Sequence, residues 1–287
     1  MANIPIRHIQ QTQKEPDLSG SFSIREIQEL LEGKDMIQEL HRHDFFYILI
    51  LKKGNGIHEI DFTKYDIVNH NVFLMRPGQV HQLILKADST GYLIQFKSDF
   101  LYTHNSVSQQ HLRKISHNNL YQLEPEGFQK IETILADILK EYNTKEKGYQ
   151  EVLKANLSIF LIELLRQRQN IPMPPAEATP YAQEKLEEFL QLVETNIATY
   201  KQVSQYTDLL NLTSYQLNTI TKTLLHKTPS DIINESILLE SKRQLLATSN
   251  QVSQIAYHLG YEDASYFIRF FKKHVGTSPE AFRNNSK

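Results

Sequence analysis

The sequence predicts an α+β protein of two domains. A small barrel or sandwich of short strands with two trailing helices is followed by an all-helical domain with two helix-turn-helix units. Three observations predict this class. Short apolar runs broken by turn residues fill positions 40–100, the apolar spacing becomes helical from position 126, and a pattern over 203–233 recurs over 252–282.

Composition and charge limit the function classes open to the 287-residue chain. It is 40% hydrophobic and 22% charged, as globular proteins are, and it is long enough for two cores. It has no cysteine, the start MANIPIRHIQQ lacks the apolar core of a signal peptide, and no apolar run could span a membrane. We therefore expect a cytoplasmic protein without a membrane partner. With a net charge of −2, nucleic-acid binding would depend on local patches.

The strands are expected between positions 40 and 100. The runs FFYILIL, KKGNGIHEIDF, YDIVNHNVFLM, RPGQVHQLIL and TGYLIQF are short, apolar or alternating, and separated by Gly, Pro, Asn and Asp. Regular short strands with such turn signals favour a sandwich or small barrel. The aromatic residues at 45, 46, 62, 73, 96 and 100 are expected in its core.

Two helices should follow. Apolar residues at 128, 131, 135, 138 and 142 are spaced 3, 4, 3 and 4, which places them on one side of a helix, and residues 153, 157, 160 and 164 form a second such stripe. Both stripes suit packing on the sandwich or against a second copy of the chain. The segment RQNIPMPPAEATP contains four prolines and predicts an exposed linker. We expect domains at 1–168 and 181–287, joined by the linker 169–180.

The C-terminal repeat predicts paired helix-turn-helix units. Each copy has a short amphipathic helix, a tight turn, a longer helix, and a Pro that opens a further helix. Residues with matching local roles occupy equivalent places: Asn211 and Gly260 at the turn, Thr213 with Gln216 and Asp263 as helix caps, and Pro229 and Pro279 behind Thr228 and Ser278.

The longer helix of the second unit has two distinct sides. Tyr266, Phe267, Phe270 and Phe271 are expected on its buried side, and the other side carries Ala264, Ser265, Ile268, Arg269, Lys272 and Lys273. An α-helix with its side chains is about 10–12 Å wide and fits the major groove of B-DNA. There Arg269 could pair with a guanine, and the lysines could neutralise phosphates. A solvated basic face on a packed helix is the alternative for one unit alone. Two units in tandem favour double-stranded DNA as the partner.

The connector between the units should be a rigid rod. Residues 230–247 form one continuous helical pattern, and 18 residues at 1.5 Å each span about 27 Å. Such a rod could hold two recognition helices about one DNA turn apart, roughly 34 Å, so that they enter successive major grooves.

The C-terminal hundred residues resemble the DNA-binding domain of the AraC/XylS family of bacterial transcription regulators. The segment IAYHLGYEDASYFIRFFKKHVGTSPEAFR carries that resemblance. It implies that bases are faced by Ala264, Ser265, Ile268 and Arg269 in the second unit and by Tyr215, Asn218 and Thr219 in the first. Thr219 stands where many members carry arginine, and His226 stands where Gly276 stands in the second copy. Basic and acidic residues are equal in number over 181–287. We therefore expect Arg269, Lys272, Lys273 and Arg283 to supply much of the DNA affinity.

The N-terminal half contains two histidine motifs, HRHDFFY at 41–47 and RPGQVH at 76–81. His41 and His43 share one face of a strand, and His81 could join them, so three imidazoles could form a metal site. Both motifs resemble a cupin, but the carboxylate that metal cupins add is missing, since Asp44 is on the wrong face and Tyr47 lies near the expected place. We assign no catalytic residue, metal ligand or cofactor. A metal-dependent cupin enzyme with a helical appendage is the alternative.

The family resemblance implies that the barrel binds a small-molecule effector and that the helices after it form a homodimer contact. Carried onto this chain, the candidate ligand-binding residues are His41, His43, Tyr47, Arg76 and His81. Arg76 could grip an anionic ligand or be solvated, and no partner is identified for His58 or His70, which are expected in turns or at strand edges. The leading hypothesis is a ligand-responsive transcription regulator, with RNA polymerase as a candidate partner. A sensor acting mainly through protein partners, with weak DNA contact, is a third hypothesis.

Overall fold

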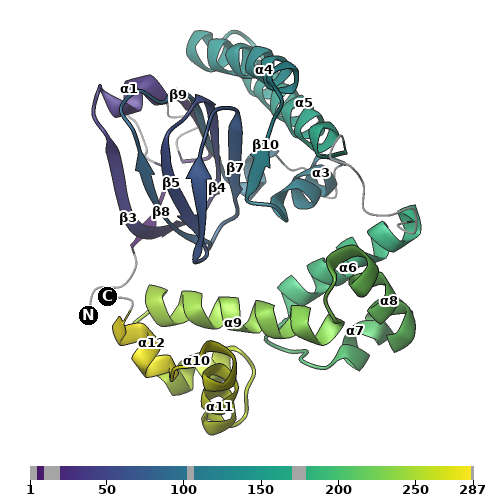
Figure 1. Cartoon of the computed structure of the whole chain (residues 1–287). Coiled ribbons are helices and arrows are strands. Elements are labelled where there is room, and N and C mark those ends of the chain that lie inside the picture. The colour runs from purple at the N-terminus through teal and green to yellow at the C-terminus, as the bar shows by residue number, and fades with distance from the viewer. Residues whose placement is uncertain (1–4, 10–19, 102–106, 170–178, 286–287) are drawn as a thin grey trace. The chain divides into compact units, whose positions relative to one another are not determined.

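The computed structural model describes residues 5–9, 20–101, 107–169 and 179–285 (Figure 1). The chain divides into two compact units, Pro5–Pro172 and Met173–Lys287. Most of the predicted linker, residues 170–178, lies outside the described residues, so the domain limits at 168 and 181 stay a prediction. Across the described ranges, no helix has the length and apolar character needed to cross a membrane.

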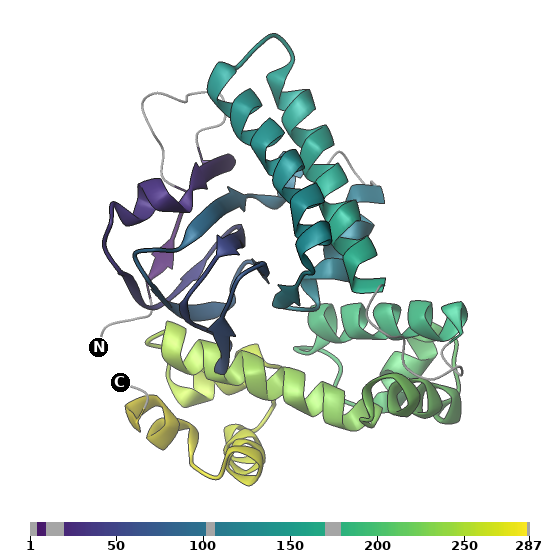
Figure 2. The same ribbon diagram turned by 45° about the horizontal axis from the view of Figure 1, so that its top comes forward.

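The first unit contains two five-stranded sheets, as expected for a sandwich or barrel (Figure 2). Among the described strands, all pairings are antiparallel except that between β1 and β3. One sheet has the order β1 (Ile6–Arg7), β3 (Met36–His43), β8 (Val80–Leu85), β5 (Gly56–Ile60), β6 (Thr63–Ile67). The other has the order β10 (Leu120–Gln122), β7 (Asn71–Met75), β4 (Phe46–Lys53), β9 (Thr90–Phe96), β2 (Phe22–Glu26).

Strand β4 explains why the run FFYILIL does not alternate. Ile48 and Ile50 on one face join the core beneath the helices, whereas Tyr47 and Leu49 on the other face join the core between the two sheets. A strand covered on both faces needs apolar side chains at every position. The predicted aromatic core is largely confirmed, because Phe45, Phe73, Phe96 and Phe100 are buried, with Phe46 and Phe62 half-buried.

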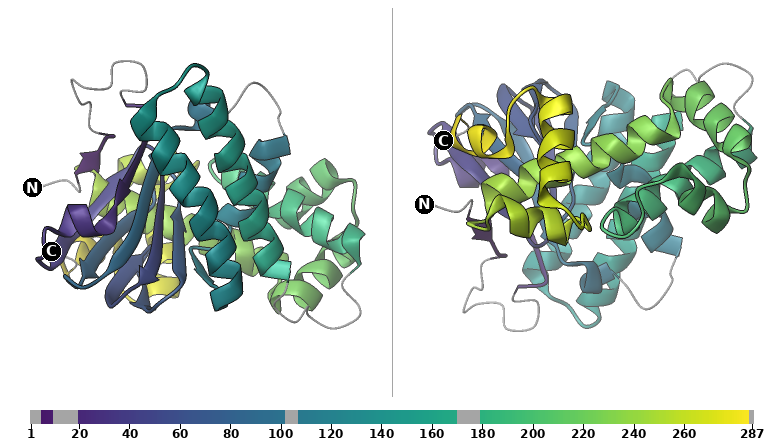
Figure 3. Two further views of the ribbon diagram at one scale, coloured as in Figure 1. Left: turned by 90° about the horizontal axis from the view of Figure 1, so that it is seen from above. Right: turned by 90° about the horizontal axis from the view of Figure 1, so that it is seen from below.

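Five helices are described in this unit: α1 (Ile27–Leu31), α2 (Ser98–Leu101), α3 (Val107–Ser116), α4 (Pro125–Thr144) and α5 (Tyr149–Gln169). Helices α4 and α5 form the predicted trailing pair and lie side by side across one sheet (Figure 3, left). All nine stripe residues are buried within one hydrophobic cluster that includes strands β2, β4, β7 and β9. Both stripes therefore belong to the core of their own unit.

Over residues 179–285, the described part of the second unit, all regular structure is helical. It contains α6 (Pro180–Asn196), α7 (Val203–Leu210), α8 (Ser214–Leu225), α9 (Pro229–Ala247), α10 (Val252–His258), α11 (Ala264–Val275) and α12 (Pro279–Asn285). The predicted turn residues Asn211 and Gly260 have positive φ angles of 53° and 76°. The capping box of Thr213 and Gln216 is confirmed, and Asp263 caps α11 by accepting a hydrogen bond from the Ser265 backbone. The turns and helix caps of the two helix-turn-helix units are thus determined by residues close to them in the sequence.

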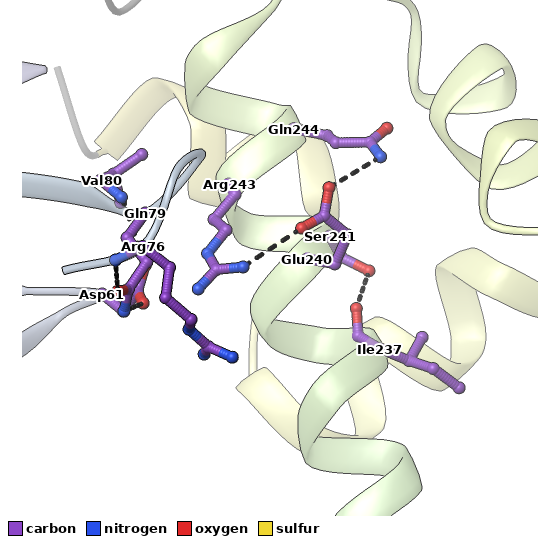
Figure 4. Close-up of polar contacts among 9 residues, drawn as sticks. All are labelled: Asp61, Arg76, Gln79, Val80, Ile237, Glu240, Ser241, Arg243 and Gln244. Atoms are coloured by element: carbon purple, nitrogen blue, oxygen red, sulfur yellow. Dashed lines mark hydrogen bonds and ion pairs between the residues drawn. The ribbon is translucent and has the colours of Figure 1, made fainter. Parts of the chain in front are cut away.

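Helix α9 is the predicted rod between these units. It runs from the α7–α8 pair to the α10–α12 helices (Figure 1) and packs against members of both groups. Its buried residues Ile233, Ile237 and Leu245 belong to one hydrophobic cluster shared by both pairs of helices. On its polar side, Glu240 accepts hydrogen bonds from Arg243 at 3.4 Å and from Gln244 at 3.0 Å (Figure 4). The 19 residues of α9 span about 28 Å, so the rod has the expected length.

Candidate functional site

Helix α11 carries an exposed basic face above a buried aromatic one. Phe267 and Phe271 are fully buried, and they fix the rotation of the helix in its core. On the opposite side Ser265, Ile268, Arg269, Lys272 and Lys273 are exposed, with Ala264 half-buried at the start of the helix. Within this unit, most of the α11 side chains that the sequence predicted to face DNA are therefore accessible.

Tyr266 is a correction to the sequence prediction. It was expected on the buried side, but its side chain is 59% exposed, and Phe270 is half-buried. Tyr266 precedes Phe267 by one residue, or about 100° around the helix, which turns it out of the core. Its ring lies 5.9 Å from the buried ring of Tyr261. This contact places a large aromatic side chain next to the exposed basic face.

Helix α8 belongs to the first helix-turn-helix unit, and the side chains predicted to face DNA there are uncharged. Tyr215 is 79% exposed, Thr219 is exposed, and Asn218 is half-buried. The Thr219 hydroxyl donates a hydrogen bond to the Tyr215 carbonyl at 2.9 Å, which fixes its side chain along the helix. Exposed Lys222 follows one turn later and was not among the predicted DNA contacts. Its place three residues after Thr219 is the signal that could have found it.

Arg283 does not supply DNA affinity as we expected from its charge. Its residue is only 6% exposed. The guanidinium donates from Nε to the Leu245 carbonyl at 2.9 Å and from Nη2 to the Asn250 carbonyl at 2.7 Å. These carbonyls lie at and beyond the C-terminal end of α9, where backbone acceptors lack helical donors. Arg283 therefore ties α12 to the end of the rod.

The first unit contains a cluster of four buried histidines. His41 and His43 come from β3 and His81 from β8, as the sequence suggested, and all three are 0–4% exposed. The fourth, His58, corrects the prediction that it lies in a turn or at a strand edge without a partner. It is fully buried on β5, next to β8. Its alternation with buried Ile60 in GIHEI was the available signal.

The side chains of these histidines contact one another directly. His81 Nε2 lies 2.8 Å from His43 Nε2 and 2.9 Å from His41 Nε2, and His81 Nδ1 lies 2.8 Å from His58 Nε2. His81 is therefore the centre of the cluster. One ring nitrogen each of His41, His43 and His81 lie within 4.8 Å of one another, which is the spacing of candidate metal ligands.

A β-bulge brings the two histidines of β3 into this position. Gln38 pairs with Leu83 and His41 pairs with His81, so three steps along β3 match two along β8. The extra residue changes which face of the strand points inward. Both Met36, which packs against the core between the sheets, and the pair His41 and His43 can then face the interior.

Burial keeps the cluster uncharged. Desolvation lowers the pKa of His41 to about 4 and those of His43 and His58 to about 3, and it lowers the pKa of His81 well below its usual value. Neighbouring histidines and Arg7 add smaller effects in the same direction on His43 and His81. Neutral imidazoles each present one lone pair, which suits them to bind a metal ion or accept a hydrogen bond.

Tyr47 forms a wall of the cluster, and Arg76 begins the adjoining turn. The Tyr47 ring is buried and stacks on His43 at 5.2 Å, and burial raises the pKa of its hydroxyl. Half-buried Arg76 starts the Pro-Gly turn, where Gly78 donates its N–H to the His43 carbonyl at 2.8 Å. Gln79 then holds this turn to Asp61 through a 2.5 Å hydrogen bond (Figure 4). The five predicted ligand-binding residues thus comprise four packed rings and one residue of the turn.

Two other residues complete the comparison with the sequence. Asp44 is exposed and accepts a hydrogen bond from His8 at 2.8 Å, so it lies outside the cluster, as expected. His70 lies in a turn, as expected, and its ring stacks on Phe128 at 4.9 Å, a partner that the sequence did not identify. Its φ angle is positive, at 62°. It precedes β7, which belongs to one sheet, whereas the four histidines of the cluster lie on β3, β5 and β8 of the other.

Comparisons with known proteins agree with this arrangement. The model of the AraC-like ligand binding domain matches residues 32–152, and a helix-turn-helix domain model matches residues 206–285. The chain belongs to the AraC family of transcription regulators. As a member of the AraC family, it is a DNA-binding regulator with an N-terminal ligand-binding domain.

Several relatives span most of the chain. The transcriptional activator RhaR of Mannheimia succiniciproducens is 25% identical over 252 residues, covering 85% of this chain and 87% of its own. The activator RhaS of Pectobacterium carotovorum is 22% identical over 260 residues, covering 86% and 88%. Among solved structures, ToxT from Vibrio cholerae aligns with a TM-score of 0.43 and 15% identity, over 92% of this chain and 97% of its own.

Proposed function

We propose that this AraC-family regulator reads DNA with helices α8 and α11, acts as a cytoplasmic homodimer, and is switched by a ligand at the histidine cluster. The observation that carries the DNA assignment is the two-sided character of α11, in which buried Phe267 and Phe271 support an exposed Arg269. A helix anchored by its own core can enter a major groove without losing its fold.

In this proposal the exposed side chains of α11 divide their roles by chemistry. Arg269 makes a two-pronged contact with a guanine, and Lys272 and Lys273 neutralise phosphates. Ser265 and half-buried Ala264 are short enough for base edges to approach the start of the helix, and Ile268 offers a methyl contact to thymine. The second helix-turn-helix unit therefore contributes most of the charge-dependent DNA affinity.

Helix α8 contributes a different kind of contact. Tyr215, Asn218 and Thr219 are polar side chains without a formal charge, so they add hydrogen bonds and apolar contacts to bases without phosphate neutralisation. Lys222 is the exposed cation on that helix nearest to them in sequence. The first helix-turn-helix unit thus contributes more to sequence selectivity than to DNA affinity.

The proposed homodimer uses helix α5. Val152 and Ile159, 42% and 47% exposed, lie seven residues apart and thus on one side of the helix. Each directly precedes a buried residue of the stripe, Leu153 or Phe160, so this side is turned by about 100° from the stripe that packs on the sheet. Exposed apolar residues at this spacing are suited to a parallel or antiparallel helix contact with a second copy.

The regulatory step is a population shift. A ligand that binds one state of the barrel better than another changes which arrangement of the two DNA-binding units the dimer favours. His41, His43, Tyr47, Arg76 and His81 are the proposed ligand-binding residues. His58 joins them through its contact with His81.

The deciding experiment measures binding of the full chain to a DNA site selected from a random pool by the wild-type protein. Replacing Arg269 by Ala should weaken specific binding by about 1–3 kcal/mol and relax the base preference at one position. Exposed Glu262, in the turn before α11, gives the control: Glu262→Gln should not weaken binding. Unchanged affinity of the Arg269→Ala protein would remove Arg269 from the interface.

A further inference from the structure

Three histidine nitrogens converge on one point inside the barrel. His41 Nε2 and His43 Nε2 both face His81 Nε2, at 2.9 Å and 2.8 Å, and all three residues are buried. Two come from alternate positions of β3 and the third from the paired position of β8. The three rings are thus fixed by sheet geometry.

Hydrogen bonding alone cannot satisfy these three atoms. His41 Nδ1 lies 2.7 Å from the Glu39 carbonyl, which can only accept, so Nδ1 holds the proton and Nε2 presents a lone pair. His81 Nε2 must then carry a proton to bond with it. That single N–H also faces His43 Nε2, which would require one donor to serve two acceptors in different directions. A proton on His43 Nε2 would instead bring two N–H groups together.

We propose that His41, His43 and His81 form a binding site for a divalent transition-metal ion, with Zn²⁺ as the best fit. A cation at the centre of the triangle would accept all three lone pairs and remove the shortage of protons. Imidazole nitrogen is a preferred ligand of zinc, and three histidines leave one coordination position for water or a ligand atom.

The dimensions of the triangle suit this ion after a small adjustment. Zinc–nitrogen bonds of about 2.0–2.1 Å in tetrahedral geometry separate the nitrogens by roughly 3.3 Å. The two contacts to His81 are 2.9 Å and 2.8 Å, so each must lengthen by roughly half an ångström. The ring nitrogens of His41 and His43 lie within 4.8 Å of each other, and they must adopt the same separation when the ion binds.

The surrounding hydrogen bonds also fit a metal site. Histidine ligands of metals usually donate their second N–H to a carbonyl or another acceptor, which fixes the ring. His41 already donates to the Glu39 carbonyl. With Nε2 of His81 on the ion, its Nδ1–H would donate to His58 Nε2, 2.8 Å away. His58 is therefore a positioning residue for the site.

A direct contact with a larger organic ligand explains the cluster less well. The three side chains are 0–4% exposed, so a sugar or aromatic acid could reach their nitrogens only after the rings separate. A single ion needs no such opening. It would also cross-link β3 to β8 beside the turn whose Gly78 binds the His43 carbonyl. That the ion regulates DNA binding rests on the proposed function, whereas its binding does not.

The test is a Zn²⁺ titration of the full-length protein by calorimetry, after treatment with a chelator and removal of that chelator. We expect one ion per chain. His81→Asn, His41→Asn and His43→Asn should each abolish stoichiometric binding, and His58→Asn should weaken it by about 10- to 100-fold. Co²⁺ in place of Zn²⁺ should give the visible absorption of a low-symmetry, four-coordinate site, and His81→Asn should remove it.

His70→Asn is the matched control, because it removes an imidazole of the same unit at a position of positive φ, which Asn tolerates. It should bind Zn²⁺ as the wild type does. Circular dichroism verifies that each variant is folded. If His81→Asn does not fold, the His58→Asn affinity and the rise in Tm of the wild type with Zn²⁺ provide the decision.

The proposal is overturned if folded wild-type protein takes up no stoichiometric Zn²⁺ or Co²⁺, or if His70→Asn loses as much binding as His81→Asn. Failure of the regulatory proposal gives a different result. Zn²⁺ would then bind stoichiometrically through the three histidines while the DNA affinity of the protein stayed the same with and without the ion.

Discussion

The guanidinium of Arg283 on α12 donates from Nε to the carbonyl of Leu245 at 2.9 Å, near the end of α9. This basic residue thus acts within the protein fold. We expect Arg283→Ala to lower the free energy of unfolding by about 2–3 kcal/mol, because the carbonyls of buried Leu245 and half-buried Asn250 lose a charged donor. Urea unfolding monitored by circular dichroism gives the value. Arg269→Ala is the control, with a stability change within about 0.5 kcal/mol. Equal stability of the two variants would contradict the role assigned to Arg283.

The lysines of α11 should act through charge alone. Lys272→Ala and Lys273→Ala should each weaken DNA binding to a similar extent for specific and unrelated sequences, because phosphates are common to both. Each should also reduce the slope of log affinity against log salt by about one. Fluorescence anisotropy over a range of salt concentrations measures this slope. A slope identical to that of the wild type for both variants would exclude these lysines from the phosphate contacts.

Gly260 should tolerate no side chain. A Cβ at this position would lie 1.7 Å from the Ala198 carbonyl oxygen, and the φ angle of 76° is already unfavourable for other residues. We expect Gly260→Ala to cost about 2–5 kcal/mol of stability from strain and overpacking combined. Gly276→Ala is the matched control, since φ there is 86° but a Cβ meets nothing within 4 Å. It should cost only about 1–2 kcal/mol. Similar losses for both would show that the close approach to Ala198 does not matter.

The proposed dimer predicts a selective effect on α5. Replacing both Val152 and Ile159 by Glu should shift the protein from dimer to monomer, because charged side chains would be buried in an apolar contact. Sedimentation analysis at several protein concentrations measures this change. Exposed Glu151, one residue before Val152, allows the control Glu151→Gln, which should leave the dimer intact. A dimer that persists in the double variant would place the contact elsewhere.

Much of the second unit could be predicted from sequence because its organisation is local. Asn211, Gly260 and Thr213 set the turns and caps through residues at most four positions away, and the repeat of these choices revealed the two units. The change of apolar period at the start of α4 is a local signal of the same kind. Tyr266 was misplaced because four neighbouring aromatics do not reveal which one the helix rotation turns outward.

The errors in the first unit and at Arg283 have a different origin. His58 joins the cluster because β5 pairs with β8, and the order of strands in a sheet does not follow from the sequence pattern of one strand. Arg283 meets carbonyl groups 33 and 38 residues earlier in the chain. Contacts over such distances depend on the complete fold, whereas charge and periodicity describe only the local segment.

Helix α9 shares one hydrophobic core with both helix-turn-helix pairs. The two helix-turn-helix pairs are therefore held at a fixed separation, and neither can slide relative to the other. Inserting one base pair between two contacted sites would turn the second by about 35° around the duplex axis. Two rigidly connected helix-turn-helix pairs cannot follow that rotation. The duplex would have to twist or bend to bring both contacted sites back to the recognition helices. Flexible base-pair steps between the contacted sites would then favour binding without being touched by any side chain.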